Sequence, residues 1–94
     1  MKNINMQIIK LLIDNELYEL SQADKNTIYN AIYHLMDDIE ISDIWEGYIK
    51  EQDKSLERYV FDGVIGFMKY KNYNANDLYN HEDDCEIFDF IHSL

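Results

Sequence analysis

Apolar residues recur every three or four positions along most of this chain, which is the spacing of one face of an α-helix. A first stripe predicts a helix over about residues 5–20 and consists of Ile9, Leu12, Ile13, Leu17 and Leu20. A second stripe predicts a helix that reaches about residue 40 and consists of Ile28, Ile32, Leu35 and Ile39. The second stripe follows Ser21-Gln22-Ala23-Asp24, a spacing typical of an N-terminal capping box.

The segment from residue 55 to 71 admits two interpretations. As a helix it has Ser55 as its N-cap and buries a stripe formed by Leu56, Tyr59, Val60, Val64, Phe67 and Met68. As a pair of strands it would turn at Asp62-Gly63, a dipeptide that favours a type I′ hairpin. The helix is favoured because the stripe keeps its phase through the supposed turn, and because a hairpin would need a third strand. In that helix Gly63 and Gly66 share one face and permit the close approach of a neighbouring helix.

Shorter elements occupy the rest of the chain. Ser42 is a capping residue that predicts a short third helix. A polar loop after residue 71 offers Asn74 or Asn76 as the cap of the next helix. The tail from Asp77 onward is typical of one broken helix or of two short ones.

The composition supports a folded helical domain. Hydrophobic residues make up 47% of the 94 residues, and there are only 3 Gly and no Pro to interrupt a helix. We therefore predict an all-α fold, a compact single-domain bundle of four to six short helices that spans residues 1–94. The alternative is an α+β fold with a hairpin at residues 58–68.

The net charge of the chain limits the kinds of macromolecule that it can bind. The chain has 19 Asp and Glu against 8 Lys and Arg, which gives a net charge of −11 and a pI near 4.4. The sequence has no basic patch to neutralise phosphates, so direct binding to nucleic acid or to an anionic membrane is disfavoured. The charge is also uneven, because residues 1–31 carry −1, residues 32–63 carry −6 and residues 64–94 carry −4.

Two acidic segments are the candidate partner-binding sites. The first surrounds the junction of the second and third predicted helices and contains Asp37, Asp38, Glu40, Asp43 and Glu46, with the aromatic residues Trp45 and Tyr48 beside them. The second contains Glu82, Asp83, Asp84 and Glu86. Solvated helix faces and cap positions would account for many of these carboxylates. The functional interpretation is that both segments occupy a basic groove of another protein and imitate the charge of a nucleic-acid backbone, with Trp45 and Tyr48 as interface anchors.

The sequence offers little for catalysis, metals or cofactors. Its single cysteine, Cys85, excludes an internal disulfide framework and a multi-cysteine zinc site. The potential ligands between His81 and His92 match no zinc module and no calcium loop. There is no glycine-rich phosphate loop. We therefore expect a protein that is not an enzyme, with no catalytic residue, no metal and no cofactor.

In size, charge and expected fold class the chain is similar to the small, acidic, helical inhibitors that mobile elements such as phages direct against bacterial defence nucleases. These include anti-CRISPR and anti-restriction inhibitors, some of which act as DNA mimics. That resemblance implies an inhibitor that masks the basic, nucleic-acid-handling surface of a partner. The alternatives are a toxin-neutralising immunity protein and a regulatory subunit that self-associates, for example as a homodimer. No run approaches the roughly 20 apolar residues of a membrane span, so a cytoplasmic protein is expected.

Overall fold

The computed structural model describes residues 4–38, 55–81 and 84–93, and all regular structure in these ranges is helical. Five helices follow one another in the described chain: α1 (Met6–Glu16), α2 (Gln22–Asp38), α4 (Leu56–Lys71), α5 (Ala75–Tyr79) and α6 (Asp84–His92). The predicted all-α bundle is therefore confirmed. The predicted third helix after Ser42 lies outside the described residues.

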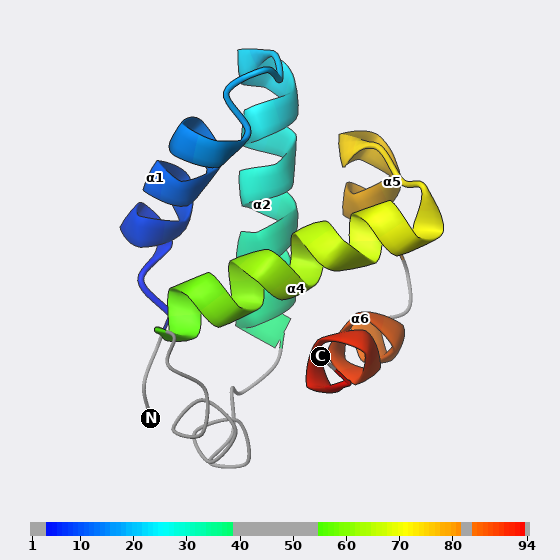
Figure 1. Cartoon of the computed structure of the whole chain (residues 1–94). Coiled ribbons are helices and arrows are strands. Elements are labelled where there is room, and N and C mark those ends of the chain that lie inside the picture. The colour runs from blue at the N-terminus through cyan, green and yellow to red at the C-terminus, as the bar shows by residue number, and fades with distance from the viewer. Residues whose placement is uncertain (1–3, 39–54, 82–83, 94) are drawn as a thin grey trace.

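The first two helices form an antiparallel pair whose start points are set by local caps (Figure 1). Asn5 accepts a hydrogen bond from the amide of Gln7 at 3.0 Å, and Ser21 accepts one from the amide of Asp24 at 3.1 Å. The predicted end of the first helix near residue 20 is wrong, because α1 ends at Glu16. The chain must reverse direction between Leu17 and the Ser21 cap, and Leu17 has already left helical geometry with φ −107° and ψ 35°.

The central element is α4, which crosses the middle of the molecule in Figure 1. Ser55 caps it by accepting a hydrogen bond from the amide of Arg58 at 3.2 Å, as predicted. It is a continuous helix through residues 58–68, so the hairpin alternative is wrong. Asn72 ends it in the left-handed region with φ 58°. Six of its residues are buried: Tyr59, Val60, Phe61, Gly63, Val64 and Phe67.

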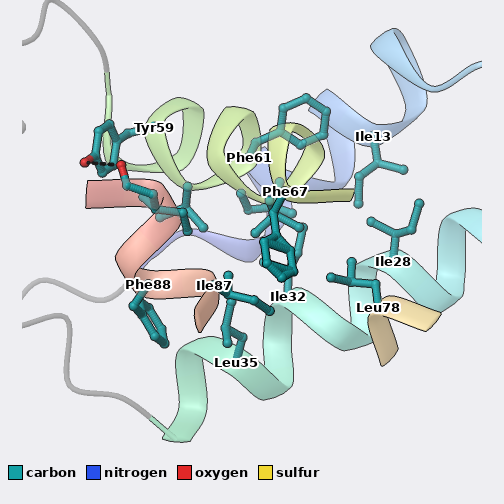
Figure 2. Packing of buried hydrophobic residues seen from close by; sticks show 14 of the residues in the cluster. Ile13, Ile28, Ile32, Leu35, Tyr59, Phe61, Phe67, Leu78, Ile87 and Phe88 are labelled. Carbon is teal, nitrogen blue, oxygen red and sulfur yellow. Dashed lines mark hydrogen bonds between the residues drawn. The ribbon is translucent and has the colours of Figure 1, made fainter. Parts of the chain in front are cut away.

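The glycines of α4 allow α6 to pack closely, as the sequence predicted for a neighbouring helix. A Cβ atom added to Gly63 would lie 2.5 Å from Cγ1 of Ile91, and one added to Gly66 would lie 3.2 Å from Cε1 of Phe90. On the same interface the Tyr59 hydroxyl donates a hydrogen bond to the carbonyl oxygen of Ile91 at 3.0 Å (Figure 2).

The tail forms two short helices. Asn74 caps α5 in a reciprocal capping box with Asp77, in which the two side chains accept from each other's backbone amides at 2.8 and 3.0 Å. The main neighbour of α5 is α2, and that of α6 is α4. A single hydrophobic core draws buried residues from all five described helices.

The only arginine in the sequence ties α1 to α4. The guanidinium of Arg58 forms a bidentate ion pair with the carboxylate of Glu16 in α1. Its Nε also donates a hydrogen bond to Asp62, one turn further along α4, at 3.1 Å. The hydrogen bond with Glu16 is the main reason that the pKa of Arg58 is raised above its ordinary value. No helix within the described ranges is long and apolar enough to cross a membrane.

Candidate functional site

The described chain contains four of the predicted partner-binding residues. Asp37 and Asp38 are the last two residues of α2, Asp84 is the first residue of α6, and Glu86 follows within the first turn of α6. The others lie outside the described residues, and for them the prediction stands as it was made: Glu40, Asp43, Trp45, Glu46, Tyr48, Glu82 and Asp83.

The core brings the end of α2 beside α6. Leu35, two residues before Asp37, is buried, and so is Ile87, one residue after Glu86. Both line the same small cavity, and Figure 2 shows their side chains next to each other. The backbone segments that carry Asp37 and Asp84 are about fifty residues apart in the sequence, yet they belong to helices that meet at one end of the bundle. This end, with Asp37, Asp38, Asp84 and Glu86, is called the acidic end below.

Three of these aspartates adjoin segments outside the described residues. Asp37 and Asp38 are the last described residues of α2 before residue 39, and Asp84 is the first described residue of α6 after residue 83. The structure therefore places them by the course of the α2 and α6 backbones.

Glu86 is held by two neighbours. It forms an ion pair with Nζ of Lys71, at the end of α4, and its second oxygen lies 3.4 Å from Nε2 of His81. The hydrogen bond from Lys71 lowers the pKa of Glu86 and raises the pKa of Lys71 relative to their ordinary values. The Glu86 side chain is 40% exposed, so it joins α6 to α4 and still faces solvent on one side.

An aromatic cluster packs against the residues of this ion pair. Phe67 is buried and makes edge-to-face contacts with Tyr73 and with the ring of His81, at centroid distances of 5.8 and 5.3 Å. Tyr70 stacks on Phe90 and remains 71% exposed. Nζ of Lys71 lies 6.0 Å from the ring centroid of Phe67 and 5.9 Å from that of Tyr70. The aromatic cluster therefore contacts both residues that pair with Glu86.

Two features of α1 were missed by the sequence analysis. Ile8 and Leu11 are exposed large apolar residues, with 38% and 59% of their surface accessible. A groove of about 190 Å³ between α1 and α2 is lined by Lys10, Ile13, Asp14, Gln22, Lys25, Asn26 and Tyr29. The signal for the first feature was present in the sequence, because Ile8 and Leu11 form a second apolar row beside the stripe that begins at Ile9.

Within the described ranges, His, Cys, Asp and Glu side chains form no group of three or more that could hold a metal ion. Cys85 is exposed near the start of α6. No family model matches the chain, and neither does any curated protein or solved structure. The acidic end is therefore interpreted from its own residues and geometry.

Proposed function

We propose that the protein is a non-enzymatic inhibitor whose acidic end covers a basic, nucleic-acid-handling surface of another protein. The observation that carries this proposal is that the core places the last described turn of α2, with Asp37 and Asp38, beside α6, which carries Asp84 and Glu86. Carboxylates gathered from two helices concentrate negative charge, which favours a cationic partner.

The arrangement of the two helix ends supports a single contact region. α2 and α6 meet through Leu35 and Ile87, so the acidic end of α2 and the acidic start of α6 can face one partner together. A groove lined with Lys and Arg that normally holds phosphates presents rows of positive charge to such a surface. Association of this kind is fast and strongly dependent on salt.

The test is capture followed by competition. The full chain is immobilised and incubated with a bacterial lysate at about 50 mM and about 300 mM salt, concentrations over which screening of exposed charges changes strongly. A captured protein is then purified, and its binding to a labelled nucleic acid is titrated with free inhibitor. The proposal expects capture mainly at low salt and displacement of the nucleic acid. It is contradicted if the captured proteins bind no nucleic acid, or if they bind inhibitor and nucleic acid at the same time.

A further inference from the structure

The outward face of α1 is mostly uncharged. Ile9 and Ile13 point into the core and are buried. With 3.6 residues per turn, Leu11 lies at the centre of the opposite side, with Gln7 and Asn15 next to it and Ile8 and Asp14 at its two margins. Leu11 is 59% exposed and Ile8 38%. Contiguous exposed apolar surface is typical of association sites.

The charge distribution indicates which partner this face can meet. Two copies of a chain with net charge −11 repel each other at most orientations. Residues 1–31, which include α1, carry only −1, whereas the other two thirds of the chain carry −6 and −4. Of the three thirds of the chain, the one that contains α1 therefore repels a second copy least.

One edge of this face carries two opposite charges that match the same edge of a second, antiparallel copy. Lys10 and Asp14 lie one turn apart on the same edge of α1, and within the described ranges neither belongs to an ion pair. In an antiparallel pair of α1 helices centred at Leu12, Lys10 of each copy lies across from Asp14 of the other. Glu16, on the side of α1 that faces α4, is already held by Arg58. A two-fold interface requires such reciprocal matching.

We propose that the protein forms a homodimer through this face, with the two α1 helices antiparallel about a two-fold axis. Lys25 of α2, across the groove from Lys10, adds a second positive charge facing the partner's Asp14. α4 separates α1 from α6 (Figure 1), so α6 of each copy lies away from this interface. The dimer stands independently of the proposed inhibitory function. Because one short helix buries less than the roughly 800 Å² per partner of a stable interface, the dissociation constant is expected to be micromolar.

Sedimentation equilibrium of the full chain tests the dimer. The protein concentration runs from about 10 µM to 1 mM, a range that covers the expected dissociation constant. The wild type is expected to shift from monomer to dimer. Leu11→Glu places a charge at the centre of the face and is expected to abolish the shift. The matched control Tyr33→Glu adds the same charge at an exposed aromatic residue of α2 and is expected to dimerise as the wild type does. Circular dichroism establishes that each variant is folded.

A charge exchange tests the antiparallel register. Lys10→Asp brings two aspartates together across the axis and is expected to weaken the dimer by about tenfold or more. Adding Asp14→Lys to that variant restores opposite charges and is expected to recover affinity to within about threefold of the wild type. The proposal is overturned if the wild type is monomeric throughout, if Leu11→Glu dimerises normally, or if the exchange fails to restore the dimer. The nucleic-acid competition is scored separately, so either proposal can fail alone.

Discussion

Ile91 of α6 occupies the space that the missing side chain of Gly63 leaves open on α4. A Cβ atom at position 63 would lie 2.5 Å from Cγ1 of Ile91, well inside van der Waals contact. Ile91 is fully buried, and its Cγ2 and Cβ atoms would also lie within 3.1 and 3.2 Å of the added atom. The distance between α4 and α6 is therefore set by a glycine, and α6 in turn sets the place of the acidic end.

Gly63→Ala is expected to destabilise the protein. Alanine gains about 1 kcal/mol of helix propensity over glycine, but overpacking a buried contact costs about 1–3 kcal/mol, and the 2.5 Å approach places this site at the upper end. Urea unfolding measures the difference. Gly66→Ala is the matched control, since its Cβ meets only the ring edge of the half-buried Phe90 at 3.2 Å. Equal stability of the two variants would contradict this account of the interface.

Tyr59→Phe is expected to lower the free energy of unfolding by about 1 kcal/mol, the usual net contribution of one hydrogen bond. The carbonyl of Ile91 lies in the last turn of α6, where no later amide of that helix can reach it, and the Tyr59 hydroxyl donates to it at 3.0 Å. Denaturant unfolding of the two proteins measures the loss. A variant as stable as the wild type would show that this bond contributes nothing.

Local signals in the sequence predicted most of the fold. Ser21, Ser55 and Asn74 were recognisable as caps because a cap depends only on its own side chain and the next three residues. The close approach at Gly63 was also predicted, but its partner in α6 was not. Periodicity identifies the face that a helix buries and says nothing about which helix covers it.

The candidate site was less accessible to prediction. The ion pair of Glu86 with Lys71 joins residues on different helices, and no local pattern indicates such a pair. The approach of α2 to α6 through Leu35 and Ile87 likewise joins distant segments, and the charges of Asp37 and Asp84 alone do not indicate it.

The Glu86 ion pair is expected to make stability depend on pH. The folded state lowers the pKa of Glu86, so the pair stabilises the protein above the ordinary carboxyl pKa and loses this contribution as the pH falls through the lowered value. Glu86→Gln should therefore be less stable than the wild type near pH 7, and the difference should shrink as the pH is lowered to about 3, below the usual carboxyl range.

Urea titrations of both proteins over this pH range make the comparison. Lys71→Met should remove the same contribution, and the double variant should lose little beyond either single change. If the stability difference between wild type and Glu86→Gln grew as the pH fell, the assigned direction of the Glu86 shift would be incorrect.

The most direct measurement is the concentration of protein that displaces half of the nucleic acid from the captured partner. It is determined for the wild type and for the Asp37→Asn, Asp38→Asn variant. The control is Glu19→Gln with Asp24→Asn, which removes the same charge from the turn before α2 and from the first turn of α2. The account predicts that the Asp37→Asn, Asp38→Asn variant needs at least about tenfold more protein, and that the control differs by less than about twofold. Equal displacement by the wild type and the Asp37, Asp38 variant would contradict it.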